Sequence, residues 1–166
     1  MTSRKITNRR MKRKLLPRAI LAAILLTLPA AADAPQDQYE RFDGDSVTIK
    51  DTFTKLEWDR KAVFKSDYDG AAGNCALLTS LQSSGRLPSV KELLTILDEE
   101  PHQEYEFGML VSKMIDALAF ANTPVDLPYW TSTPAPGIDM FWTLSFKTGL
   151  MTAQAKTAQG NARCVR

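Results

Sequence analysis

The sequence predicts an α+β fold, in which helices and strands occupy separate stretches of the chain. Three observations support this class. Alternating apolar residues near residue 50 and after residue 140 indicate strands, two helical patterns fall between residues 69 and 98, and a proline-rich stretch follows before the last strands. An α/β fold would instead alternate helices with strands along the whole chain.

The first strands are expected to form a hairpin. Residues 47–49 are β-branched and favour a strand, 51–54 have the composition of a turn, and Leu56 and Trp58 then alternate onto one face. The composition becomes helical over residues 69–83, where small and apolar residues recur on one side. A strand hairpin followed by a first helix is therefore predicted.

A second helix has the clearest local signal. Ser89 and Glu92 stand three apart, which is the spacing of a capping box, and Pro88 precedes the cap. The apolar residues that follow, Val90, Leu93, Leu94 and Leu97, fall on one face of an α-helix. This pattern predicts a capped amphipathic helix whose role is packing.

The remaining chain is less regular. Residues 101–121 are ambiguous, because Leu110, Met114 and Leu118 at spacing four also suit a further helix. Four prolines between 122 and 137 predict long loops around one short strand. Alternation over 140–146 indicates a strand with one apolar face, and shorter strands are expected at 150–153 and 161–166.

The N-terminus resembles an export signal. Eight basic residues precede any acid, and an apolar run over 19–32 is shorter than the roughly 20 residues that span a bilayer. Small residues at Ala30 and Ala32 predict cleavage after Ala32; an uncleaved membrane anchor is the alternative. The predicted organisation is a signal peptide at 1–32, a short leader at 33–43 and one domain at 44–166.

Removal of this segment changes the net charge. The full chain has 21 basic and 19 acidic residues, and residues 1–32 hold eight of the bases and none of the acids, so 13 bases and 19 acids remain, a net charge of −6. An acidic domain is poorly suited to nucleic acid. The expected exported chain therefore has no nucleic-acid partner, and no membrane span after signal cleavage.

The two cysteines lie far apart in the sequence. Cys75 and Cys164 are 89 positions apart, so they form neither a CxxC redox pair nor a four-ligand metal cluster. They are either a long-range disulfide or two free thiols. An exported chain meets an oxidising environment, which favours the disulfide.

Five segments together resemble a bacterial family. They are "TKLEWDR" at 54–60, "GRLPSVKELLTILD" at 85–98, "YWTSTPA" at 129–135, "FWTLSFKTG" at 141–149 and "RCVR" at 163–166. In this order they resemble the Lcl C-terminal domain family, also called DUF1566. The resemblance implies a C-type-lectin-like fold with two main helices, antiparallel strands and long loops, in which the terminal strands pair and a disulfide joins the first helix to the last strand, matching Cys75 and Cys164.

The resemblance also implies a class of function. Family members are exported or cell-surface proteins, some of them adhesins with glycan-binding roles. We therefore expect a non-catalytic domain that binds a surface glycan or protein at the bacterial envelope. The alternatives are an envelope structural or assembly protein with protein partners only, and an enzyme, because formylglycine-generating enzymes also use the C-type lectin fold.

Candidate site residues follow from these expectations. The loop-rich region suggests a ligand site at Tyr129, Trp130, Thr131 and Ser132, where an aromatic face and hydroxyl groups are adjacent. The acids Asp98, Glu99 and Glu100 are weak candidates for calcium. The calcium-chelating tripeptides of sugar-binding lectins, Glu-Pro-Asn, Gln-Pro-Asp and Trp-Asn-Asp, do not occur, so no cofactor is expected. His102 is the only histidine, and no catalytic role is assigned to it.

Overall fold

The protein is described from a computed structural model. The structure describes residues 35, 37–40, 46–60, 64–82, 84–106 and 108–166. They all lie in the compact unit Ala31–Arg166. The predicted signal peptide at 1–32 lies outside the described residues, as does most of the predicted leader.

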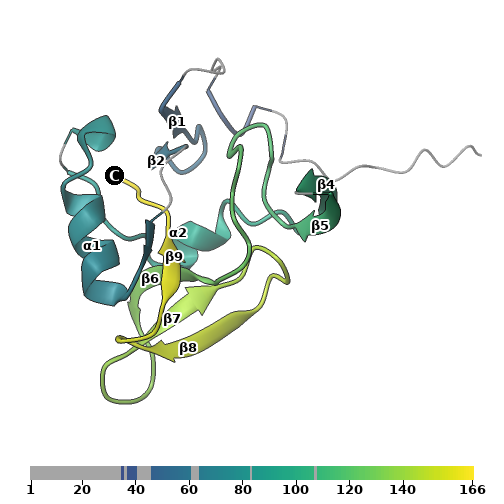
Figure 1. Cartoon of the computed structure of the whole chain (residues 1–166). Coiled ribbons are helices and arrows are strands. Elements are labelled where there is room, and N and C mark those ends of the chain that lie inside the picture. The colour runs from purple at the N-terminus through teal and green to yellow at the C-terminus, as the bar shows by residue number, and fades with distance from the viewer. Residues whose placement is uncertain (1–34, 36, 41–45, 61–63, 83, 107) are drawn as a thin grey trace, which may run out of the picture. The chain divides into compact units, whose positions relative to one another are not determined.

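Strands outnumber helices among the described residues (Figure 1). The elements in order are β1 (Thr48–Lys50), β2 (Glu57–Asp59), β3 (Phe64–Ser66), α1 (Tyr68–Ala76), the 3₁₀ helix η1 (Thr79–Leu81), α2 (Val90–Leu94), β4 (His102–Glu106), β5 (Met109–Lys113), β6 (Tyr129–Pro134), β7 (Met140–Leu144), β8 (Met151–Ala155) and β9 (Gly160–Ala162). The predicted mixture of helices with mainly antiparallel strands is confirmed.

Strand β3 and four strands from the second half of the chain form a five-stranded sheet. Its order is β3-β9-β6-β7-β8, and the neighbours are antiparallel except for β6 and β9, which pair in parallel with Tyr129 opposite Asn161. Helix α1 packs against β3 and β9. Strand β6 therefore has a neighbour on both sides.

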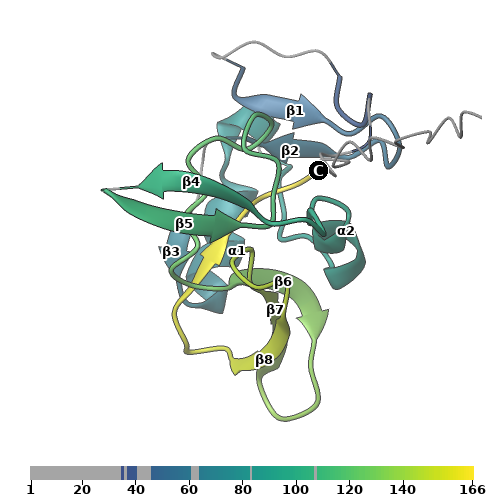
Figure 2. The same ribbon diagram turned by 90° about the vertical axis from the view of Figure 1, so that its right-hand side faces the viewer.

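The C-terminus pairs with the first hairpin. The predicted hairpin is confirmed, since β1 and β2 are antiparallel with Ile49 opposite Trp58. Trp58 also bridges Val165, and Glu57 and Arg166 exchange backbone hydrogen bonds of 3.0 and 2.9 Å. Figure 2 shows the C-terminus beside β2. The start and the end of the described domain are thus held together by backbone hydrogen bonds.

The first helix is capped and covalently fixed. The Asp67 carboxylate accepts a hydrogen bond from the Gly70 N–H (2.9 Å) at the N-terminus of α1. Cys75, in the last turn, forms a disulfide with Cys164, as predicted, with Cα atoms 5.3 Å apart. Gly85 fits beside this turn because it has no side chain; a Cβ there would lie 2.5 Å from the Cys75 carbonyl oxygen.

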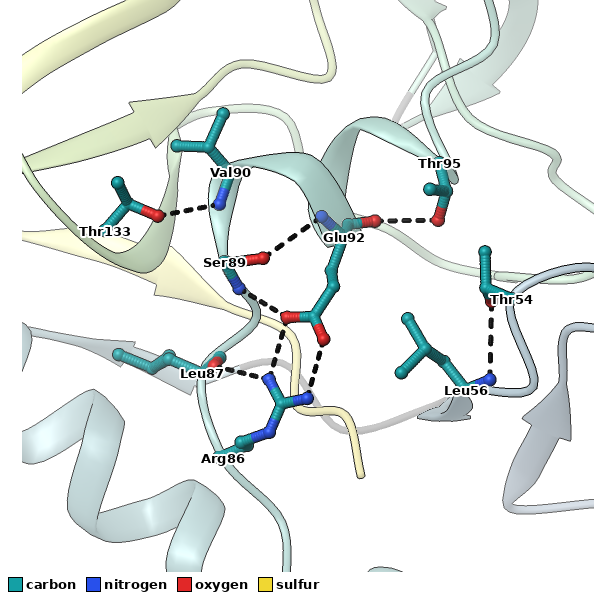
Figure 3. A network of polar contacts seen from close by, with 9 residues as sticks. All are labelled: Thr54, Leu56, Arg86, Leu87, Ser89, Val90, Glu92, Thr95 and Thr133. Atoms are coloured by element: carbon teal, nitrogen blue, oxygen red, sulfur yellow. Dashed lines mark hydrogen bonds and ion pairs between the residues drawn. The ribbon is translucent and has the colours of Figure 1, made fainter.

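The predicted capping box begins α2 (Figure 3). The Glu92 N–H donates to the Ser89 hydroxyl, and the Ser89 N–H donates back to the Glu92 carboxylate at 2.7 Å. Both terminal nitrogens of Arg86 donate hydrogen bonds to the same carboxylate, at 2.8 and 2.7 Å. The helix ends at Leu94 and does not extend to Leu97, because the Thr95 hydroxyl and N–H both bond the Glu92 carbonyl.

Glu92→Gln is expected to lower the free energy of unfolding at pH 7 by about 1–2 kcal/mol, since Arg86 is half exposed and solvent screens the pair. Hydrogen bonds from Arg86 lower the pKa of Glu92 from 4.5 to about 2. A lowered carboxyl pKa stabilises the fold fully above pH 4.5, and that stability is lost as the pH falls through about 2. The difference between the wild type and the variant should therefore shrink from pH 5 to 2.5.

Urea unfolding at pH 7, 4 and 2.5 measures this difference. Glu99→Gln, which changes an exposed acid close by, is the control and should be nearly neutral. A Glu92→Gln deficit that stays the same at pH 7 and pH 2.5 would contradict the pair's role.

The ambiguous segment forms a hairpin. The structure pairs β4 with β5, with Tyr105 opposite Leu110, whereas the sequence spacing suggested a further helix. Side chains on one face of this hairpin form ion pairs: the Lys113 ammonium is buried and contacts Glu104 at 2.8 Å and Glu106 at shorter range. Glu104 and Glu106 alternate along β4 and therefore lie on one face, where both pair with Lys113 of the neighbouring strand β5.

Two hydrophobic clusters form the core. The larger one contains Trp58 and Phe120, and the other contains Trp130 and the disulfide. Trp58 is buried, whereas Trp142 is half-buried. Within the described part of the chain, no helix has the length and apolar character that crossing a membrane requires.

Candidate functional site

The four residues predicted to bind a ligand lie on β6. Tyr129, Trp130 and Thr131 are buried, with at most 1% exposed, and Ser132 is exposed. Their polar atoms bond within the domain: the Tyr129 hydroxyl donates to the Pro124 carbonyl (2.8 Å), Trp130 Nε1 to the Ser66 carbonyl (3.1 Å) and the Thr131 hydroxyl to the Trp142 carbonyl (2.8 Å). Ligand binding here stays a prediction, and burial places three of the four residues in the core.

The predicted calcium candidates follow α2. Asp98 is half-buried and its carboxylate accepts a hydrogen bond from the Glu100 N–H (3.0 Å), while Glu99 and Glu100 are exposed. Among the residues that the structure describes, no group of three or more His, Cys, Asp or Glu side chains could hold a metal ion. A calcium role for this segment therefore stays a prediction.

His102 lies at the start of β4. Its Nε2 is 3.7 Å from a Glu104 carboxylate oxygen, too far for a hydrogen bond. The same carboxylate is held by Lys113. The histidine is thus part of the ion-pair cluster of the β4–β5 hairpin.

A pocket of about 520 Å³ forms where four segments meet. Twelve residues line it: Pro35, Gln38, Tyr39, Asp51, Phe53, Thr54, Thr95, Ile96, Leu97, Asp98, Glu99 and Asp116. They come from the N-terminal segment before β1, the turn between β1 and β2, the segment after α2 and the turn after β5. This pocket is the candidate functional site.

Asp51 holds the turn that forms one wall of the pocket. It is fully buried, and its Oδ1 accepts hydrogen bonds from the N–H groups of Phe53 (2.8 Å) and Thr54 (3.0 Å). Lys55 completes the turn with φ of +65°. The turn leaves the Phe53 ring 65% exposed at the pocket. The hydrogen bonds of this turn thereby fix where the Phe53 ring lies at the pocket.

The N-terminal segment forms another wall. The Gln38 side chain donates to the Thr95 carbonyl (2.9 Å) and is 3.4 Å from the Asp51 carboxylate. Tyr39 bridges Asp51 through the backbone and packs edge-on against Phe120, with ring centroids 5.5 Å apart. Residues placed in the predicted leader therefore contact the fold and line its pocket.

The pKa of Tyr39 reflects the negative charges that line the pocket. Burial raises the pKa of its phenol well above the usual value, and the negative charges of Asp116 and Asp51 raise it further. The positive charge of Arg163 opposes this effect. The phenol is therefore neutral at physiological pH and can both donate and accept a hydrogen bond.

Sequence reasoning missed this site because its residues are dispersed. The turn at 51–54 was predicted, and an aromatic residue within a polar turn, Phe53, was the one local signal. Nothing local connects that turn with Tyr39, Thr95 or Asp116, which it meets only in the folded chain.

Comparison with known proteins gives one family. A protein-family model described as the Lcl C-terminal domain matches residues 47–166. A comparison with curated proteins finds no match to the chain. The match covers most of the chain and includes Cys75, Cys164 and the strands of the five-stranded sheet.

Proposed function

The chain belongs to the Lcl C-terminal domain family, and on this premise we propose that it is an exported, non-catalytic binding domain. Its ligand is a glycan or a protein at the bacterial envelope or cell surface. A C-type-lectin-like fold is part of this proposal. The pairing of β2 with the C-terminal residues and the bridge from α1 to Cys164 support that fold.

The pocket carries the proposal. A ligand site needs a concave surface with some apolar area and a few fixed polar groups. Here Phe53 offers an exposed ring, onto which the C–H face of a sugar or an apolar side chain can pack. Thr54 and Asp116 offer polar groups to this space: the Thr54 hydroxyl is positioned by the Leu56 N–H (3.3 Å) and the Asp116 carboxylate by the Leu118 and Ala119 N–H groups (2.8 and 2.9 Å).

Export is proposed on two grounds. The sequence predicts a signal peptide at 1–32, and the disulfide between Cys75 and Cys164 is compatible with an oxidising compartment.

Phe53→Ala is expected to weaken ligand binding roughly 5- to 10-fold, because an aromatic contact at a pocket rim is lost. Stability should change little, since the ring is largely exposed. The measurement is a glycan array probed with the full chain purified from an exporting host, in calcium and again in chelator, followed by titration of each hit with wild type and variant.

Tyr105→Ala is the matched control, because Tyr105 is an exposed aromatic residue on the β4–β5 hairpin and does not line the pocket. Equal loss in both variants, or loss only in Tyr105→Ala, would contradict the pocket as the site. Loss of binding in chelator would revive a metal role for Asp98, Glu99 and Glu100. A blank array would contradict a glycan ligand and favour a protein partner.

A further inference from the structure

The charges that line the pocket are all of one sign. Four of its twelve lining residues are acidic and none is basic: the acids are Asp51, Asp98, Glu99 and Asp116. Residues 33–166 as a whole contain 13 bases and 19 acids. An anionic ligand would therefore be repelled, and a cation would be attracted, at this surface.

The hydrogen-bond donors that hold two of these carboxylates are neutral. Asp51 accepts from the backbone of its own turn and from the Gln38 amide. The Asp116 Oδ1 accepts from the N–H groups of Leu118 (2.8 Å) and Ala119 (2.9 Å). These donors fix the position of each carboxylate without adding a positive charge, so they do not cancel the negative charge at the pocket.

The same charges converge on one side chain. The carboxylates of Asp116, Asp51 and, more weakly, Asp98 all act on the Tyr39 phenol and favour its neutral form. These acids come from three segments that are far apart in sequence, yet they line the same pocket as Tyr39. The pocket therefore has a shared negative potential near Tyr39, beyond the separate charges on its rim.

The shape of the pocket distinguishes an organic cation from a metal ion. Within the described residues no three acidic side chains are close enough together to hold a metal. The acids instead surround a space of about 520 Å³, with the rings of Tyr39 and Phe53 on its walls. Aromatic faces attract ammonium groups, and spaced carboxylates suit a cation that carries a carbon skeleton.

We propose that this pocket binds its ligand through a primary ammonium group, carried either by an amino sugar or by a lysine side chain. The proposal rests on the proposed function, because it names the chemistry that the same site selects. The ammonium group pairs with Asp116, packs against the exposed Phe53 ring and donates a hydrogen bond to the neutral Tyr39 hydroxyl. The buried Asp51 carboxylate adds to the negative potential without touching the ligand.

The test compares charged and neutral forms of two probes. The full chain, isotope-labelled and purified from an exporting host, is titrated with glucosamine and N-acetylglucosamine, and with Nα-acetyl-lysine amide and its Nε-acetylated form. Amide shifts of Phe53, Thr54 and Leu97, which line the pocket, report binding there. We expect the charged form of at least one pair to bind roughly tenfold more tightly than its neutral form at low salt, and less so as salt is raised.

Asp116→Asn removes one charge and keeps the carbonyl oxygen that caps Leu118 and Ala119. It should weaken binding of the charged probe roughly 3- to 10-fold and leave the neutral probe unchanged. Asp139→Asn is the matched control: it makes the same change in net charge at an exposed residue outside the pocket, whose φ of +52° asparagine also tolerates. It should change neither affinity.

Phe53→Leu provides a second variant, since leucine keeps apolar area but lacks the π face. A 2- to 5-fold loss for the charged probe alone supports the ammonium contact. The sugar pair and the lysine pair show which source of ammonium is preferred, and either preference supports the proposal.

Two results would overturn it. Equal affinity for charged and neutral forms, with shifts at the pocket, would remove the charge selection and leave the proposed function intact. Binding of the charged forms that Asp139→Asn weakens as much as Asp116→Asn would show only a general attraction to an acidic protein. Failure of the proposed function is a separate result, namely a ligand from the array that binds without shifting any pocket amide.

Discussion

Replacing Cys75 and Cys164 together by alanine is expected to lower the free energy of unfolding by about 4–5 kcal/mol. The bridge closes a loop with a sequence separation of 89 residues, and it restricts the unfolded chain by that amount on a chain-entropy argument. Both residues are fully buried beside Trp130, so the folded state also loses packing. Chemical denaturation of wild type and variant measures the difference.

The reduced wild type is the control for this prediction. Wild-type protein is unfolded in denaturant with a thiol reductant and then refolded in its presence. Its free energy of unfolding should equal that of the alanine variant to within about 1 kcal/mol. A double variant that loses less than about 1 kcal/mol would mean that the bridge does not constrain the unfolded chain. Alanine is preferred to serine because it places no unpaired hydroxyl in the core.

Features that depend on a few neighbouring residues were predictable from the sequence. The capping box needs only Ser89 and Glu92, and both of its hydrogen bonds are present. The first hairpin needs a turn between two β-branched or alternating runs, and it forms as expected. The cysteine pair was predictable for another reason: with two cysteines behind a predicted export signal, only one pairing exists.

The segment 101–121 could not be resolved because two periodicities overlap in it. Leu110, Met114 and Leu118 match a helix, while the alternating acids of β4 match a strand. The strand forms because β4 pairs with β5, and Lys113 then neutralises two of those acids. A partner strand is tertiary information that a local pattern does not contain.

The residues predicted to bind a ligand illustrate the same limit. Prolines on both sides of Tyr129 to Ser132 indicated exposed loops, but β6 lies between β9 and β7, so its side chains enter the core. The pocket that the structure does contain is assembled from four separate segments. Its acids and aromatic rings form no pattern in the sequence, because they come together only in the folded chain.

Arg163 connects parts of the fold that are distant in sequence. It is fully buried, and its Nη1 donates to the carbonyls of Asp59 (2.7 Å) and Arg60 (2.9 Å), while Nη2 donates to the Thr123 hydroxyl (2.8 Å). Burial lowers the pKa of the guanidinium, which shows that its charge is costly to desolvate. The Phe120 ring, 4.8 Å away, offsets part of this cost.

Arg163→Ala is expected to lower the free energy of unfolding by about 3–5 kcal/mol, and Arg163→Lys by about 2–3 kcal/mol. Alanine leaves the Asp59 and Arg60 carbonyls without their donor and opens a cavity. Lysine keeps the charge but cannot reach both carbonyls and Thr123 from a single ammonium group.

The ranking of three variants decides whether geometry or charge matters here. Arg86→Ala, at a half-exposed arginine whose partner is a single carboxylate, should cost only about 1 kcal/mol. If charge alone held the fold, Arg163→Lys would match the wild type, and Arg163→Ala would cost no more than Arg86→Ala. We expect instead that lysine loses a little over half of what alanine loses. The Arg163 Nη1 serves the two carbonyls while Nη2 serves the Thr123 hydroxyl, and one ammonium group cannot occupy both nitrogen positions.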